Sequence, residues 1–211
     1  SDAGATKQNM QICPLSYHHR FFAAFVFHPR VREAVPQLVG DPAYKMLDQI
    51  FLKPPRVGAG TNWHQDNAYF DFADPMVGTA MWIAIHDATV ANGTIRFIPR
   101  AFDCLMPHRR DPESDHHTRY HPPDEDKAVP VELEAGGAVF FCFGTPHCTT
   151  ANNTDRERAG LAYHFTTVHN QRRELLALHQ PTQHQNLKTY GEAGKAHGPI
   201  ISGPEYSAGA R

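Results

Sequence analysis

The heptapeptide Trp63-His64-Gln65-Asp66-Asn67-Ala68-Tyr69 places an imidazole and a carboxylate two residues apart inside a strand-like run. Side chains at i and i+2 of a β-strand point to the same face, so we expect His64 and Asp66 to reach one metal ion together. With 15 histidines in 211 residues, random placement supplies about one His-x-Asp pair, and the chain contains only this one. The alternative is a solvated Asp at a surface turn, so the pair needs further support.

Composition limits the class of protein. A chain of 211 residues with 41% hydrophobic content predicts one domain over residues 1–211 with a sizeable core. A net charge of -2 gives no basic surface for nucleic acid or membrane lipids, so we expect a small-molecule partner and a monomer or homodimer. The longest apolar run, Phe21 to Phe27, is far below the roughly 20 residues that span a bilayer. A soluble, cytoplasmic protein is expected, with its cysteines reduced.

The chain divides into a polar leader, a helical flank and a region of short strands. The small polar residues 1–11 predict a disordered leader, and Ser1 in place of Met indicates either a tag remnant or a truncated N-terminus. Residues 16–39 predict two helices that break near His28-Pro29 and end at Gly40-Asp41-Pro42. The expected strands cover residues 46–52, 63–70, 79–86, 95–98, 129–133, 138–143 and 160–168.

Many short strands separated by Gly, Pro and Asn clusters predict a mainly β fold with flanking helices, here a double-stranded β-helix or jelly roll. The charged, Pro-bearing stretch 109–127 has no periodicity and predicts a long surface loop or lid. After Gln171 the chain starts helix-like and then becomes rich in Gly, Pro and Ser. We expect this tail to be loosely ordered.

A third ligand and a co-substrate anchor follow the strand 138–143. His147 comes just after a Gly-Thr-Pro turn, and Arg158 opens the next strand eleven residues later. The polar linker 152–157 predicts an antiparallel hairpin that brings His147 and Arg158 together. Two histidines and one carboxylate form the facial triad of non-haem Fe(II) oxygenases. Arg158 could bind the far carboxylate of a dicarboxylate co-substrate such as 2-oxoglutarate.

From about Phe25 to Thr167 the chain resembles the phytanoyl-CoA dioxygenase-like branch of the Fe(II)/2-oxoglutarate-dependent oxygenases. The resemblance rests on Lys53-Pro54-Pro55 before the His-x-Asp pair, on Asn92-Gly93-Thr94-Ile95-Arg96-Phe97-Ile98-Pro99, and on His147 with Arg158. The chain departs from the family pattern at Arg100-Ala101-Phe102, where Gly-Ser-His is usual, and at Gly136-Gly137, where Gly-Asp is common. The first departure bears on the loop over the substrate.

The resemblance implies an enzyme that uses Fe(II), 2-oxoglutarate and O2 to hydroxylate an unactivated C–H bond of a small molecule, releasing succinate and CO2. It implies that the metal ligands are His64, Asp66 and His147. It implies that 2-oxoglutarate contacts Arg158, Gln65, Trp82, Thr149 and Gln49. Asn62, Tyr69 and Phe70 would face substrate. In halogenating relatives a small residue replaces the carboxylate ligand, so Asp66 favours hydroxylation.

Other interpretations stay open for the site as a whole. A non-catalytic jelly-roll protein could hold a structural metal here, although such sites usually have four protein ligands. A cupin-type metalloenzyme that does not use 2-oxoglutarate would leave Arg158 without a purpose.

Individual residues also have alternatives. Arg156 could replace Arg158 as the anchor, Trp82 could be a core residue, and Gln65 and Thr149 could be ordinary strand residues. His164 shares strand parity with Arg158 and could point into the barrel, but we interpret it as a hydrogen-bonded structural histidine.

Overall fold

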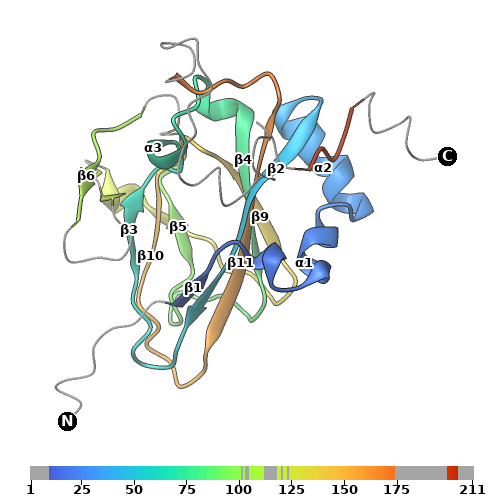
Figure 1. Cartoon of the computed structure of the whole chain (residues 1–211). Helices are drawn as coiled ribbons and strands as arrows, with labels where there is room; N and C mark the ends of the chain where they lie inside the picture. Colours follow the sequence, from blue (N-terminus) through green and yellow to red (C-terminus); the bar gives the residue numbers. More distant parts are fainter. Residues whose placement is uncertain are drawn as a thin grey trace.

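Two facing antiparallel sheets, with helices against the outside of one of them, form the protein (Figure 1). The structure is a computed structural model, and it describes residues 10–100, 102, 105–111, 118–119, 121–122, 124–173 and 199–203. The larger sheet has the order β1 (Met10–Ile12), β2 (Ala43–Lys53), β11 (Arg158–Thr167), β4 (Gly78–Ala84) and β9 (Ala138–Cys142). The smaller sheet has the order β3 (Thr61–His64), β10 (His147–Thr149), β5 (Ile95–Phe97) and β8 (Val129–Pro130).

The connections make this a jelly roll, which confirms the predicted fold class. β2 and β11 pair along their length in the larger sheet, while their chain neighbours β3 and β10 pair in the smaller one. A long two-stranded ribbon therefore bends from one sheet into the other. A short ribbon of β6 (Arg109–Arg110) and β7 (Thr118–Arg119) forms a separate two-stranded sheet, whose β7 lies against β3. The 3-10 turns are η1 (Leu15–Tyr17), η2 (Pro75–Val77) and η3 (Glu125–Lys127).

The predicted helical flank is confirmed as α1 (Arg20–Phe25) and α2 (Pro29–Val39), and the chain breaks between them at His28. The His28 side chain accepts the Arg30 N–H, Pro29 opens α2, and Gly40 ends it with a φ of 83°. α2 buries Val31, Val35 and Val39 among the residues that cover the larger sheet. This i, i+4, i+8 spacing forms one apolar stripe along the helix.

Successive side chains of β11 point alternately toward the helices and into the interior of the roll. Leu161, Tyr163 and Phe165 share a core with the residues of α2. Ala162 and His164 point the other way and line a cavity between the sheets. Because β2 pairs with β11 in register, its residues of the same parity line that cavity too.

The expected strand over residues 63–70 is wrong in its second half. β3 ends at His64, Asp66 has helical dihedrals of φ -57° and ψ -33°, and α3 covers Asn67–Phe70. The Asn67 N–H donates to Phe143 O, and its side chain bonds both backbone groups of Phe72, which closes the turn. His64 and Asp66 therefore do not meet by strand alternation: one ends a strand and the other precedes a helix.

The expected hairpin between His147 and Arg158 is also wrong, because β10 and β11 belong to different sheets. The linker between them crosses the edge of the roll. The buried Asn152 holds it there, since its amide donates to the carbonyl oxygens of Lys53, Pro54 and Arg156. His147 and Arg158 consequently face one cavity from opposite sheets.

The remaining predictions divide between described and undescribed residues. The leader is shorter than expected, since residues 10–12 pair with β2. The proposed lid contains the β6–β7 ribbon and η3, with residues 112–117, 120 and 123 outside the described part. Most of the tail, residues 174–198 and 204–211, also lies outside it. Cys13, Cys142 and Cys148 are free thiols. No helix in the described ranges is long and apolar enough to cross a bilayer.

Candidate metal centre and co-substrate cavity

Two histidines lie side by side at the cavity between the sheets, each with Nδ1 bonded to a backbone carbonyl. His64 at the end of β3 pairs in register with His147 at the start of β10. His64 Nδ1 lies 2.8 Å from Asn62 O, and His147 Nδ1 lies 2.9 Å from Thr145 O, so each ring donates to the carbonyl two residues before it. This bond fixes the tautomer and leaves Nε2 with a lone pair for a metal.

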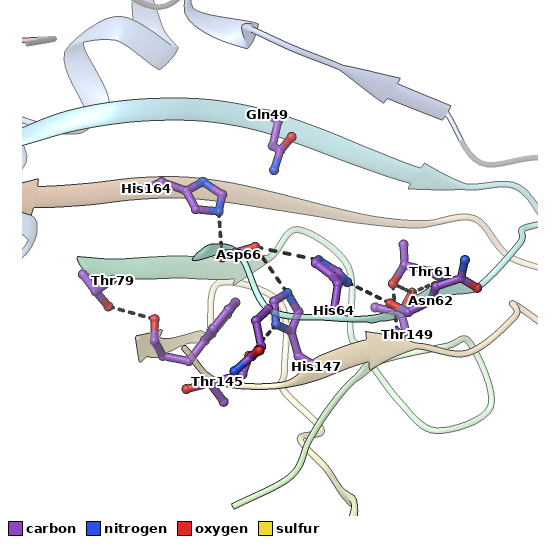
Figure 2. A network of polar contacts seen from close by, with 12 residues as sticks. Gln49, Thr61, Asn62, His64, Asp66, Thr79, Thr145, His147, Thr149 and His164 are labelled. Atoms are coloured by element: carbon purple, nitrogen blue, oxygen red, sulfur yellow. Dashed lines mark hydrogen bonds and ion pairs between the residues drawn. The ribbon is translucent and has the colours of Figure 1, made fainter. Parts of the chain in front are cut away.

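Asp66, the residue directly before α3, completes the cluster (Figure 2). Its Oδ1 lies 3.7 Å from Nε2 of His64 and 3.7 Å from Nε2 of His147. Burial alone would raise the pKa of the Asp66 carboxyl, but the imidazoles of His147, His164 and His64 hold it well below its usual range. Burial likewise lowers the pKa of His147. The carboxylate and the neutral imidazole are the protonation states that bind metals.

These three side chains fit a facial iron site. Their ligand atoms lie within 4.8 Å of one another, and all three residues border the cavity between the sheets. Two imidazoles and one carboxylate with an open side form the ligand set of non-haem Fe(II) oxygenases, whereas closed structural zinc sites use four protein ligands. The described part of the chain adds no fourth member to the cluster.

The cavity has a volume of about 250 Å³, and two buried basic side chains line it where β2 ends and β11 begins. Lys53 and Arg158 are each 1% exposed and lie opposite each other in the β2–β11 ladder. Burial lowers the pKa of Lys53 to about 6, with a further contribution from Arg158, and burial lowers the pKa of Arg158 to about 10. Neither forms an ion pair with a carboxylate among the described residues. This end of the cavity therefore favours an anion.

The Arg158 guanidinium is held by backbone and ring contacts. Nη2 donates to Gly93 O, and the guanidinium carbon lies 5.5 Å from the centre of the Trp82 ring. Gly93 has a φ of 81°, and a Cβ there would stand 2.2 Å from Thr150 O, so the Asn92-Gly93 turn requires glycine. Arg158 Nε is buried and has no hydrogen-bond partner in the described structure. A buried donor without a partner indicates a site for a ligand.

Most of the other predicted site residues line the same cavity. Trp82, Thr149, Gln49, Tyr69 and Phe70 all border it. Thr149 lies at the cationic end, where its Oγ1 accepts a 2.7 Å hydrogen bond from Lys53 Nζ. Gln49 lies midway along β2, opposite Ala162, and its Oε1 accepts a hydrogen bond from Gln11.

Two predicted residues point elsewhere. Gln65 is fully buried, its amide donates to Gly144 O at 2.6 Å, and its carbonyl accepts the Met106 N–H at 2.7 Å. Asn62 Nδ2 donates to Asp111 at 2.7 Å. Neither borders the cavity. Both instead attach the segment 105–111 to the strand that carries His64.

Two basic residues without a predicted site role, Lys53 and His164, also line the cavity. Lys53 was interpreted only as the start of a Lys-Pro-Pro turn, although it shares the parity of Gln49 on β2. His164 was interpreted as structural, yet its Nε2 lies 3.2 Å from Asp66 Oδ2. His164 lies an even number of residues from Arg158 on β11, and this spacing correctly predicts that its side chain points into the roll.

Comparison with known proteins agrees with this geometry. The model of the phytanoyl-CoA dioxygenase (PhyH) family matches residues 2–160. A probable phytanoyl-CoA dioxygenase from Caenorhabditis elegans is 31% identical over 150 residues, which cover 65% of this chain and 48% of the relative. The chain thus spans about half the length of the curated relatives it matches.

Solved structures share the fold. EvdO2 from Micromonospora carbonacea var. aurantiaca, complexed with 2-oxoglutarate, is 25% identical with a TM-score of 0.66, covering 79% of this chain and 71% of EvdO2. The epimerase SnoN from nogalamycin biosynthesis is 22% identical with a TM-score of 0.69, covering 96% of this chain and 78% of SnoN. With its ligand cluster and jelly roll, the chain belongs to the phytanoyl-CoA dioxygenase family of iron- and 2-oxoglutarate-dependent oxygenases.

Proposed function

We propose that this protein is an Fe(II)/2-oxoglutarate-dependent dioxygenase that hydroxylates an unactivated C–H bond of a small molecule. The observation that carries the proposal is the division of one cavity into two ends. The His64, Asp66 and His147 cluster borders it beside His164, and the buried basic residues Lys53 and Arg158 line it six residues further along β2 and β11. 2-Oxoglutarate, with a keto acid at one end and a carboxylate at the other, fits this arrangement.

The residues have separate tasks in this mechanism. His64, Asp66 and His147 would hold iron and leave three positions on its other side for co-substrate and O2. Arg158, Lys53 and Thr149 would hold the far carboxylate of 2-oxoglutarate, with the Trp82 ring against the guanidinium. The iron, when bound, supplies the coupled oxidation of 2-oxoglutarate to succinate and CO2.

The substrate would bind at the other end of the cavity. Leu47, Tyr69 and Phe70 line that part, and Tyr69 packs edge-on against His64 with ring centres 5.8 Å apart. Apolar and aromatic walls beside the ligands would exclude water from the reacting carbon and favour an uncharged group there. We propose Tyr69 and Phe70 as substrate contacts.

The fate of the substrate needs its own test, because structural neighbours include an epimerase and a carbocyclase. Asp66 keeps the carboxylate ligand, which favours oxygen transfer over halogen transfer. Hydroxylation adds one oxygen atom from O2 to the product, whereas epimerisation and ring closure leave the oxygen count unchanged. Reactions under labelled O2 therefore separate these outcomes by product mass.

The first experiment is anaerobic addition of Fe(II) and then 2-oxoglutarate, which should produce a weak visible charge-transfer band. A screen for compounds that stimulate succinate release follows, with labelled O2 in each positive reaction. Absence of the band at saturating 2-oxoglutarate contradicts the proposal and favours a metalloprotein that does not use this co-substrate. A band together with an unlabelled product retains the oxygenase mechanism and rejects hydroxylation.

A further inference from the structure

His164 lies directly beside the metal cluster but does not belong to it (Figure 2). It sits on β11 of the larger sheet, whereas His64 and His147 sit on strands of the smaller sheet. Its ring is 2% exposed, and Nε2 lies 3.2 Å from Asp66 Oδ2. This contact crosses the interior of the roll and joins the two sheets at the carboxylate.

The two oxygens of Asp66 have different neighbours. Oδ1 lies 3.7 Å from Nε2 of both His64 and His147. Oδ2 faces away from that pair and accepts the hydrogen bond from His164. With Oδ2 occupied by a donor, Asp66 would bind a metal through Oδ1 alone.

The surroundings of His164 give the ring no other polar partner. Its Nδ1 is buried without a hydrogen-bond partner in the described structure. Phe70 packs edge-on at 5.3 Å between ring centres, and Phe143 lies at 6.0 Å. Aromatic packing therefore fixes the ring plane, and Asp66 accounts for its hydrogen bonding. A residue that only filled this space would not need a nitrogen.

From these contacts we propose that His164 is a positioning residue: its Nε2–H holds Oδ2 of Asp66, so that the carboxylate binds iron through one oxygen. The inference rests on the proposed function, because it assigns His164 a task in the iron site. A carboxylate that binds through both oxygens takes up one more position and leaves too few for 2-oxoglutarate and O2 together. His164 would thus keep a position open for O2, by orienting the carboxylate as hydrogen-bond partners of metal ligands commonly do.

The test compares three substitutions that separate hydrogen bonding from packing. His164→Gln keeps an amide N–H close to the position of Nε2. His164→Asn places its amide near Nδ1, away from Asp66. His164→Phe keeps the ring among Phe70 and Phe143 but has no donor. His169→Gln, two residues beyond β11 and exposed, is the control.

The readouts are the affinity for Co(II), measured by calorimetry, and the visible spectrum of the Co(II) protein, which reports ligand number. The proposal expects the Phe and Asn variants to bind Co(II) about 10- to 100-fold more weakly, with altered spectra, and the Gln variant and control to match wild type. Far-UV circular dichroism verifies folding. If the Phe variant is unfolded, the Gln and Asn pair carries the same comparison.

Four results would overturn the inference, and the last of them would reject the proposed function too. If His164 only fills space, the Phe variant keeps wild-type affinity and the Gln variant does not. If His164 is itself a ligand, the Gln variant changes the spectrum as much as the Phe variant. If wild type binds Co(II) and all variants match it, only the role of His164 is rejected. If wild type fails to bind Fe(II) or Co(II), the proposed function fails as well.

Discussion

Arg158 and Lys53 lie opposite each other in the β2–β11 ladder and line the cavity, and their positions lead to separate predictions. Arg158 offers a planar guanidinium whose Nε has no partner in the described structure. The Lys53 amine donates to Thr149 Oγ1 and Thr150 O, and the residue lies opposite Arg158 in the β2–β11 ladder. The first residue supplies directed donors, while the second supplies a charge that depends on pH.

Replacing Arg158 with Ala should weaken 2-oxoglutarate binding while leaving metal binding nearly unchanged. The loss of a charged, bidentate contact with a carboxylate should cost about 2–4 kcal/mol, which corresponds to roughly 30- to 1,000-fold in affinity. Titration of the anaerobic Fe(II) protein with 2-oxoglutarate measures the change. Arg156→Ala, two residues earlier and exposed, is the matched control. Unchanged affinity in the Arg158 variant would move the anchor elsewhere.

The low pKa of Lys53 predicts that the protein takes up a proton when it binds 2-oxoglutarate. The free site holds this lysine at a pKa of about 6, so it is mostly neutral at pH 7.5. An incoming carboxylate favours the ammonium and raises that pKa, so the complex gains a proton. Affinity should therefore be highest near pH 6 and fall as pH rises, by at most about tenfold per pH unit.

Calorimetry in buffers of different ionisation enthalpy counts the protons taken up by this binding reaction. Lys53→Met keeps the aliphatic stem and removes the titrating group, so its affinity should be lower at pH 6 and nearly independent of pH up to 8. Proton uptake that persists in the Lys53→Met variant would assign the effect to another group.

At the scale of elements, the β2–β11 ladder positions the site because every second residue of each strand faces the cavity. Lys53, Gln49 and Leu47 on β2 face the cavity opposite Arg158, Ala162 and His164 on β11. Gly160 shares that parity and leaves space for a neighbour: a Cβ there would stand 2.7 Å from Trp82 Cζ2. The indole that packs on Arg158 therefore depends on a glycine one strand away.

Gly160→Ala should consequently disturb both stability and co-substrate binding. Forcing a methyl group against the indole costs about 1–3 kcal/mol. The displaced ring should weaken 2-oxoglutarate binding by several-fold through Arg158. Chemical denaturation and 2-oxoglutarate titration measure the two effects. In a Trp82→Ala background the same substitution should have little further effect, and additive losses would show that the clash lies elsewhere.

The elements also show which features of the site could be predicted. The candidate cluster could be predicted because His64, Asp66 and His147 carry the side-chain types that bind iron, and the structure brings these three residues together. The reason given for their meeting was wrong, because α3 has only four residues, too few for a helical period to be visible in the sequence. The sheet to which β10 belongs could not be predicted either. It depends on how Asn152 holds the linker that runs from β10 in the smaller sheet to β11 in the larger one.

At the scale of the whole molecule, the site joins the two sheets of the roll. His64 and His147 belong to the smaller sheet, and Lys53, Arg158 and His164 to the larger one. A metal alone would engage mainly the smaller sheet and α3. 2-Oxoglutarate, bound to both the metal and Arg158, would bridge the sheets. Ligand binding should therefore stabilise the fold in a cooperative manner.

Thermal unfolding tests this coupling. A ligand at 100 times its dissociation constant stabilises by about 2.7 kcal/mol, which for a chain of this size raises Tm by roughly 5–10 °C. We expect 2-oxoglutarate alone to change Tm little, and 2-oxoglutarate with Co(II) to raise it by more than the sum of the separate shifts. In Arg158→Ala the Co(II) shift should remain and the additional shift should disappear. Equal shifts for 2-oxoglutarate with and without metal would mean that it binds away from the cluster.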